Sequence, residues 1–420
     1  GRVKSVTAIT EVYGDGQKVT AVAVEYTKSI KNEGLSAASF AVDGHTVPKV
    51  YANTSAAKAA QGTDGNYVII ELAVDSVIDA GGGFGAGAGR PEGGGPGAGP
   101  GRPVGGSPGD DPGMGPGGDA PPVDETQSAE PEPIRVSVTQ AGPLITTDGE
   151  TYSPDSGAMG NDRVINVVVD DFLRLDYTDP QTGATLMYNL YVPKGYDQAK
   201  SYPLVLFIHD AGVSGPQHDK TLTQGLGAVI WATPSEQAKH ECFVLAPQYH
   251  TVIANDNSET TEYMDMTVDL IRLLETQYSL DTDRLYTTGQ SMGCMTSIAM
   301  NIKYPDLFAA SLLVAGQWDP NAMSVLSAAN LWIVVSEGDT KAYPGMNASL
   351  AILAAKGAKI SRATWDGGAS ALELASDVNR MLAEGGNINY TVLQGGSHTY
   401  TWQVAYSIEG LRDWLFTQAK

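Results

Sequence analysis

The chain has 420 residues and a formal net charge of −22, a length that suits two or three domains with at least one large core. The strong negative charge disfavours nucleic acid or an anionic membrane surface as a partner. The sequence contains no run of about 18 apolar residues, so no transmembrane helix is predicted. We expect a secreted or extracellular protein. The opening residues 1–4 are not a signal peptide, but this does not argue against secretion, because a mature or trimmed form would lack the signal.

The two cysteines, Cys242 and Cys294, are predicted to be buried free thiols. Cys242 opens a predicted strand at its N-terminal end, whereas Cys294 lies at the opposite edge of the same sheet. A strand of five or six residues separates these edges by roughly 15–20 Å. A disulfide needs Cα atoms within about 7 Å.

Residues 3–79 predict a small β domain. Residues 19–26 and 67–74 alternate apolar and polar side chains, and Gly14-Asp15-Gly16 is a turn signal between the first two strands. Several short strands separated by turns favour a sandwich of immunoglobulin-like type. No catalytic constellation occurs here.

Residues 81–120 differ in character, since they hold 19 of the 49 glycines and 7 of the 23 prolines. Such a segment cannot bury enough apolar surface to fold, so we predict a disordered insert over 81–132. Residues 133–140 alternate again and could return as a further strand of the sandwich. We therefore predict one interrupted β domain at 1–147, because a long loop between paired strands adds little closure entropy.

A second domain is predicted at 160–420, where strand and helix patterns alternate. Residues 164–169 and 185–192 are expected to form a leading antiparallel pair. Residues 203–208 form a continuous apolar run, and further strands are predicted at 243–246, 284–288, 310–315, 331–335 and 388–393, with helices near 261–278, 292–303, 345–356, 370–384 and 404–418. This alternation is typical of an α/β protein with a doubly wound, mostly parallel sheet, whose ligands bind at the carboxyl ends of the strands.

The stretch Gly289-Gln290-Ser291-Met292-Gly293 lies between a predicted strand and a predicted helix. A strand, G-x-S-x-G and a helix form the nucleophile elbow of α/β-hydrolases. The elbow lifts the serine hydroxyl to the carboxyl end of the sheet. Alone, this short motif is weak, because it also occurs by chance.

Two further residues strengthen the interpretation of Ser291 as a nucleophile. Asp339 follows the strand 331–335, and His398 follows the strand 388–393. The order serine, acid, histidine is that of α/β-hydrolases. His398 would take the serine proton and return it to the leaving group, while Asp339 would orient the imidazole. Glu337, Asp319 and Asp366 compete for the acid role, and of these Asp319 and Glu337 also lie near strand ends.

The oxyanion of the reaction needs two backbone donors. The first is expected to be the N–H of Met292, which starts the helix after the nucleophile. The second should come from the loop after 203–208, where we favour Ala211, with Asp210 as the alternative. His209 at the base of this loop is predicted to be structural.

Residues 163–420 resemble esterases grouped with polyhydroxybutyrate depolymerases and feruloyl esterases of the α/β-hydrolase superfamily. The matching stretches are 202–212, 244–248, 289–293, 316–319, 332–339 and 397–398. Some members have an N-terminal immunoglobulin-like domain, which is similar to the domain predicted here. One departure is Asp210, where many relatives have glycine.

Three side chains are expected to contact substrate from their positions: Trp318 past the strand 310–315, Gln290 beside the nucleophile, and Trp402 one helical turn after His398. Core packing is the alternative for both tryptophans. Aromatic platforms suit a phenolic acyl group or a sugar ring.

The predicted function is a serine carboxylic-ester hydrolase acting through an acyl-enzyme on feruloyl, acetyl or other short-chain esters of plant polysaccharide. The alternatives are a prolyl-oligopeptidase-type serine peptidase and a non-catalytic carbohydrate-binding protein. The six histidines and two cysteines show no metal-ligand spacing, and the mechanism needs no cofactor. The sequence does not predict the oligomeric state.

Overall fold

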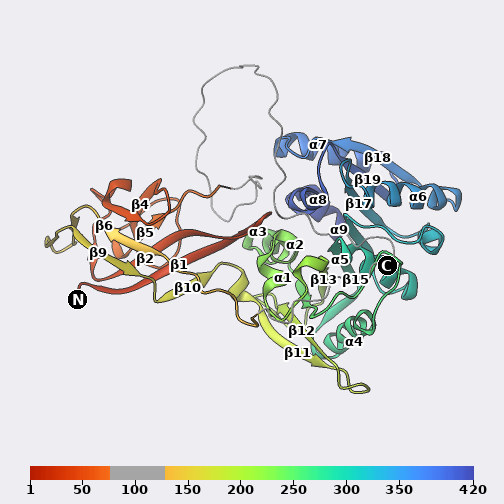
Figure 1. Ribbon diagram of the computed structural model, residues 1–420, viewed down its shortest axis with the longest axis horizontal. Coiled ribbons are helices and arrows are strands. Elements are labelled where there is room, and N and C mark those ends of the chain that lie inside the picture. The colour runs from red at the N-terminus through yellow and green to blue at the C-terminus, as the bar shows by residue number, and fades with distance from the viewer. Residues whose placement is uncertain (76–127) are drawn as a thin grey trace, which may run out of the picture.

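The computed structural model describes residues 1–75 and 128–420 and comprises two domains joined side by side (Figure 1). The first is built from β-strands with one short 3₁₀ turn, and the second has helices on both faces of a large sheet. Over the described residues, no helix combines the length and the apolar character needed to cross a bilayer.

The first domain is a β sandwich, as predicted. Its larger sheet has the order β10-β1-β2-β5-β4, and a smaller sheet has the order β3-β6-β9. Their facing side chains form one buried cluster that includes Val24, Phe40 and Val138. The elements are β1 (Val3–Tyr13), β2 (Gly16–Ile30), η1 (Ala37–Ser39), β3 (Phe40–Val42), β4 (Lys49–Asn53), β5 (Gly65–Glu71), β6 (Ser137–Gln140), β7 (Leu144–Ile145), β8 (Thr151–Tyr152), β9 (Asp155–Gly160) and β10 (Arg163–Asn166).

The strand predicted after the insert is confirmed. β6 pairs with β3, in the register Phe40↔Gln140 and Val42↔Val138, so the chain returns to the sandwich that it left after β5. The predicted disordered insert at 81–132 lies outside the described residues, apart from residues 128–132.

The leading antiparallel pair was predicted wrongly. Residues 163–166 form β10, which lies parallel to β1 in the first domain. β12 (Thr185–Tyr191) pairs instead with β11 (Leu173–Thr178), a strand that the sequence did not predict. An alternating pattern predicts a strand and its buried face but does not say which strand lies beside it. The first domain thus extends past the predicted start of the second domain at residue 160.

The second domain contains a nine-stranded sheet in the order β11-β12-β14-β13-β15-β16-β17-β19-β18. β12 is antiparallel to both neighbours, and all strands from β14 onward are parallel, which confirms the predicted mostly parallel sheet. The strands are β13 (Tyr202–Ile208), β14 (Phe243–Gln248), β15 (Leu280–Gln290), β16 (Ala310–Val314), β17 (Leu331–Ser336), β18 (Ile360–Trp365) and β19 (Ile388–Leu393).

Helices cover both faces of this sheet. The α-helices are α1 (Lys220–Thr223), α2 (Leu226–Val229), α3 (Pro234–Lys239), α4 (Glu262–Gln277), α5 (Met292–Lys303), α6 (Ala342–Ala355), α7 (Ala371–Ala383), α8 (His398–Ala405) and α9 (Glu409–Phe416); short 3₁₀ turns are η2 (Val169–Asp171), η3 (Ala211–Val213), η4 (Ile230–Ala232) and η5 (Ala322–Leu326). The helix predicted at 404–418 is in fact two, because α8 ends at Ala405 and α9 begins at Glu409.

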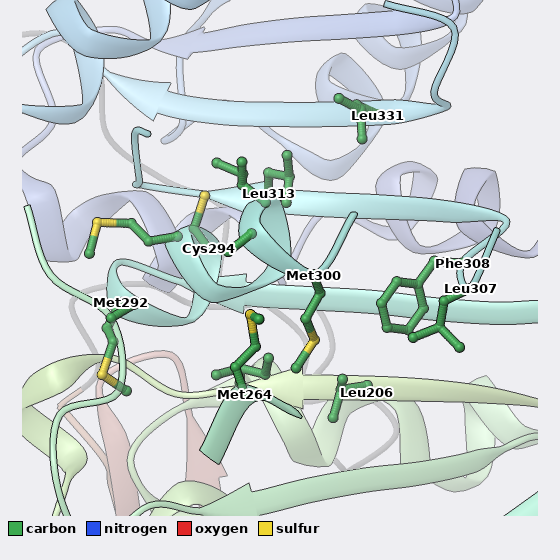
Figure 2. Close-up of a cluster of buried hydrophobic side chains, with 14 of the residues drawn as sticks. Leu206, Met264, Met292, Cys294, Met300, Leu307, Phe308, Leu313 and Leu331 are labelled. Atoms are coloured by element: carbon green, nitrogen blue, oxygen red, sulfur yellow. The ribbon is translucent and has the colours of Figure 1, made fainter. Parts of the chain in front are cut away.

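Two buried clusters, one on each face of the sheet, hold the helices in place. One contains Met292 and Met300 of α5, Phe308 from the segment after α5, and Leu206 of β13 (Figure 2). The other contains side chains of α2, α8 and α9, together with Val12 of β1 from the first domain. Cys294 belongs to the first cluster and Cys242 to the second. Both thiols are free, as predicted.

Candidate active site

Ser291 lies in a sharp turn between β15 and α5. Its backbone has φ 52° and ψ −116°, a conformation that is strained for a residue with a side chain. The Ser291 N–H donates to the carbonyl of Val314 on β16 at 3.0 Å, and the Ser291 carbonyl accepts from Met295 in α5 at 3.0 Å. The neighbouring strand and the helix therefore hold the strained turn from both sides.

The glycines of the motif are required by close approach of backbones. A Cβ on Gly293 would lie 1.8 Å from the carbonyl oxygen of Ile208, and a Cβ on Gly289 would lie 2.4 Å from the carbonyl carbon of Gly293. No side chain fits at such distances, so only glycine lets β13, β15 and the start of α5 meet here.

The structure brings the three predicted triad residues together in one hydrogen-bonded chain. Ser291 Oγ lies 2.9 Å from His398 Nε2, and His398 Nδ1 lies 2.5 Å from Asp339 Oδ2. Asp339 follows β17, and His398 begins α8 after β19. These strands are neighbours in the sheet, in the register Ser336↔Leu393. Their carboxyl ends therefore place Asp339 beside His398.

Asp339 is 3% exposed. Burial raises the pKa of this carboxyl, but the hydrogen bond to His398 and those from the backbone outweigh burial and hold the pKa below its usual value. Its other oxygen, Oδ1, accepts from the N–H groups of Lys341 at 3.1 Å and Ala342 at 2.9 Å. The carboxylate is thus fixed in its ionised form with one oxygen left for the imidazole.

The competing acids make other contacts. Glu337 accepts the N–H of Gly395 at 2.8 Å and so ties the loop after β17 to the loop that carries His398. Asp319 accepts the N–H of Ala322, and Asp366 accepts the N–H of Gly368. Asp319 and Asp366 thus stabilise local turns, whereas Glu337 connects two loops.

The two expected oxyanion donors both begin a helical turn. Met292 is the first residue of α5, and Ala211 is the first residue of η3. The first N–H groups of a helix have no acceptor within the helix and point outward. Met292 follows the elbow at the end of β15, and Ala211 follows the carboxyl end of β13. These two strands are neighbours in the sheet.

His209 at the base of this loop is fully buried, and burial lowers its pKa to about 4. Its Nε2 accepts the N–H of Tyr249 at 3.0 Å, so the proton of the neutral ring is on Nδ1, which donates to the carbonyl of Asp210 at 2.7 Å. The neutral imidazole therefore joins the loop after β13 to the end of β14, a structural role.

The predicted substrate-contacting residues are largely buried. Trp318 is 7% exposed within the cluster on the α5 face, and Trp402 is 7% exposed and packs edge-on against His398. Gln290 is fully buried, and its amide nitrogen donates to Asp210 and Gln224. The structure thus places Trp402 against His398 and Gln290 next to Ser291.

The sequence did not predict a polar cluster beside the loop after β17, which carries Asp339. Asp256, in the loop after β14, contacts Lys341 Nζ at 2.7 Å and Gln317 Nε2 at 3.1 Å. It joins the loops after β14, β16 and β17. No local pattern marks Asp256; only its place after a strand end could have drawn attention to it. Across the described ranges, no group of three His, Cys, Asp or Glu side chains could hold a metal ion.

Both domains match models of known protein families. Residues 5–153 match the family model for the esterase Ig-like N-terminal domain, and residues 186–372 match that for esterase PHB depolymerase. The two matches lie in the same order as the two domains of the chain, an Ig-like domain followed by a domain similar to esterases. This pairing agrees with the two domains of Figure 1.

A solved structure described as a thermostable esterase aligns over 100% of both chains, with a TM-score of 0.75 and 25% identity. Among curated proteins, acetylxylan esterase A of Aspergillus ficuum is 29% identical over 34% of this chain and 45% of its own length. A probable feruloyl esterase C of Aspergillus terreus is 28% identical over 31% of this chain and 46% of its own length. The chain therefore spans less than half the length of the curated relatives that it matches.

Proposed function

We propose that this chain is a serine carboxylic-ester hydrolase that works through an acyl-enzyme. The observation that carries the proposal is the continuous chain from Ser291 Oγ through the imidazole of His398 to the buried carboxylate of Asp339. This hydrogen-bonded chain lies at the carboxyl ends of β15, β17 and β19. In such sheets, ligands bind at the carboxyl ends of the strands.

In the first step, Ser291 Oγ attacks the ester carbonyl carbon and its proton passes to His398 Nε2. Asp339 stabilises the resulting imidazolium. The N–H groups of Met292 and Ala211 stabilise the oxyanion of the tetrahedral intermediate. The C–O bond to the alcohol then breaks, and His398 returns the proton to the leaving oxygen. Water attacks the acyl-enzyme by the same route and releases the acid.

The proposed substrates are feruloyl, acetyl or other short-chain esters of plant polysaccharide. The support for this class comes from the acetylxylan and feruloyl esterases with which the chain aligns. Polymeric substrates of this kind lie outside cells, so secretion is part of the proposal.

A substrate panel tests the proposal. We expect turnover of p-nitrophenyl acetate and methyl ferulate, and no turnover of a peptide anilide. Ser291→Ala should abolish turnover, whereas Ser376→Ala, at an exposed serine of α7, should not change it. Turnover of the anilide alone would favour a peptidase, and full ester turnover by Ser291→Ala would exclude Ser291 as the nucleophile.

A further inference from the structure

Three polar side chains form a connected group beside the nucleophile. The amide nitrogen of Gln290 donates to Asp210 Oδ1 at 2.8 Å and to Gln224 Oε1 at 2.9 Å. Gln290 directly precedes Ser291, and Asp210 directly precedes Ala211. A single buried amide therefore connects the nucleophile elbow with the loop expected to bind the oxyanion.

The amide nitrogen of Gln290 faces both acceptors of this group. Its NH₂ is directed at Asp210 Oδ1 and at Gln224 Oε1, so the other amide atom of each glutamine lies outside these two hydrogen bonds. Gln290 Oε1 and Gln224 Nε2 are left buried without a hydrogen-bond partner among the described residues. Folded proteins rarely retain unpaired buried polar atoms, and each such atom calls for an explanation.

The first domain reaches this group through the tip of its β1–β2 hairpin, residues 13–16, which we call the hairpin tip. Figure 1 shows this hairpin extending from the sandwich toward α2 of the esterase domain. A Cβ on Gly14 would lie 2.8 Å from the carbonyl oxygen of Gln403 in α8, and a Cβ on Gly225 would lie 3.2 Å from that of Gly14. The tip is therefore wedged between α8 and the segment that follows Gln224.

Both neighbours of the hairpin tip contain a residue that belongs to or contacts the surroundings of Ser291. α8 begins with His398, and the segment on the other side carries Gln224. A Cβ on Gly16 would lie 3.7 Å from the carbonyl oxygen of Thr223 and 3.8 Å from that of Gln224, so the tip follows this segment over several residues. The base of the hairpin is fixed as well, because Val12 is 3% exposed in the apolar cluster that contains side chains of α2 and α8.

We propose that Gln224, Gln290 and Asp210 are positioning residues that set the oxyanion loop relative to Ser291, and that the hairpin tip of the first domain holds this group in place. The inference rests on the proposed esterase function and extends it to the first domain. The three side chains act through Ser291 and Ala211. The first domain thereby becomes part of the catalytic apparatus, and its action does not require contact with the ester.

The first test removes the acceptor at Gln224 and keeps its shape. In the full chain, Gln224→Met should lower kcat for p-nitrophenyl acetate about tenfold to a hundredfold, since a displacement of about 1 Å can cost this much. KM should stay within about twofold of the wild-type value, because ground-state binding is not affected. The control is Gln237→Ala on α3, which removes a side-chain amide that donates to the carbonyl of Trp231 in η4 at 2.8 Å and should leave kcat unchanged.

The second test displaces the hairpin tip. Gly14→Ala should lower kcat without a matching rise in KM, whereas Gly160→Ala, where a Cβ meets no atom within 4 Å, should be silent. If the tip acts through Gln224, the double variant should lose less than the product of the two single effects. Thermal melting of every variant shows that each remains folded.

Three outcomes would overturn the inference: wild-type kcat in both Gln224→Met and Gly14→Ala, effects that appear in KM alone, or strictly multiplicative effects in the double variant. Each of these leaves the proposed function intact, provided that the wild type hydrolyses the ester and Ser291→Ala does not. A wild type without Ser291-dependent turnover would instead overturn the proposed function, and this inference with it.

Discussion

The ring of Trp402 meets the imidazole of His398 edge to face, with ring centroids 5.1 Å apart and planes at 84°. The two residues lie four apart in α8, a spacing that places side chains over one another on a helix. Trp402 was predicted to contact substrate. Its position against the imidazole favours a role in holding the side chain of His398.

Replacing Trp402 should therefore impair catalysis more than binding. An edge-to-face aromatic contact contributes about 0.5–1.5 kcal/mol, so Trp402→Leu should lower kcat roughly two- to tenfold with little change in KM. Trp402→Phe keeps a ring and should retain most activity. A rise in KM for methyl ferulate with kcat unchanged would show that Trp402 contacts the acyl group. Kinetics with methyl ferulate and p-nitrophenyl acetate distinguish the two results.

Asp339→Asn should lower kcat by about four orders of magnitude, because the amide cannot hold the imidazole in the required tautomer. The pKa of Asp339 is held below its ordinary value of 3.8. This carboxylate therefore stabilises the fold fully above that value, and its contribution is lost as the pH falls through the lowered pKa. Urea unfolding from pH 6 to pH 2 should show a smaller acid loss in Asp339→Asn than in the wild type. Glu337→Gln is the control and should retain the triad.

His209 makes the protein less stable in mild acid. Its pKa falls from 6.5 to about 4 on folding, so below pH 6.5 the unfolded chain binds a proton that the folded chain excludes. The loss grows from pH 6.5 to about 4 and reaches about 3 kcal/mol. His209→Gln should remove this part of the pH dependence, whereas His45→Gln, at an exposed turn, should not. Equal slopes in all three proteins would contradict the prediction.

Gly293→Ala should prevent correct folding of the elbow, because its Cβ would overlap the carbonyl of Ile208. Overpacking of this kind costs about 1–3 kcal/mol or more, and the shift displaces Ser291. We expect a lower melting temperature and no measurable esterase activity. Gly195→Ala is a matched change, since its Cβ would lie 3.6 Å from the nearest atom, Glu241 Oε1, and it should be tolerated.

Asp256→Asn should have a small effect that depends on the substrate. The ion pair with Lys341 is partly exposed, and pairs of this kind contribute about 0.2–1 kcal/mol. Loosening it frees the loop beside Asp339 and should reduce kcat/KM up to about fivefold, more for methyl ferulate than for the acetyl ester. Asp265→Asn breaks a similar pair with Lys303 on the outer side of α4 and should leave both values unchanged.

The local patterns of the chain were sufficient to predict the elbow and the two domain types. Ser291 lies in a short motif with fixed backbone requirements, and Asp339 and His398 each follow a continuous apolar strand. Parallel strands bring their carboxyl ends to one edge, so chain order alone predicts that these side chains meet. The return of β6 to the sandwich was likewise readable from its alternating pattern.

Other features depend on contacts between segments that no local pattern encodes. Asp256 meets Lys341 across 85 residues, and Gln290 meets Gln224 across 66. Their pairing follows from the strand order of the sheet and from the path of the loops. The partner of β10 was missed for the same reason. The burial of Trp318 also depends on how η5 and α6 pack, which the sequence around Trp318 does not determine.

The hairpin that joins the two domains has a consequence for biosynthesis. A chain emerges from the ribosome with its N-terminal domain first, so β1 and β2 exist before α2 and α8 are made. Val12 fills a place in the apolar cluster on the α8 face of the later domain, so that cluster is complete only when the hairpin is docked. We therefore expect a destabilised hairpin to reduce the yield of folded second domain even where every residue of that domain is intact.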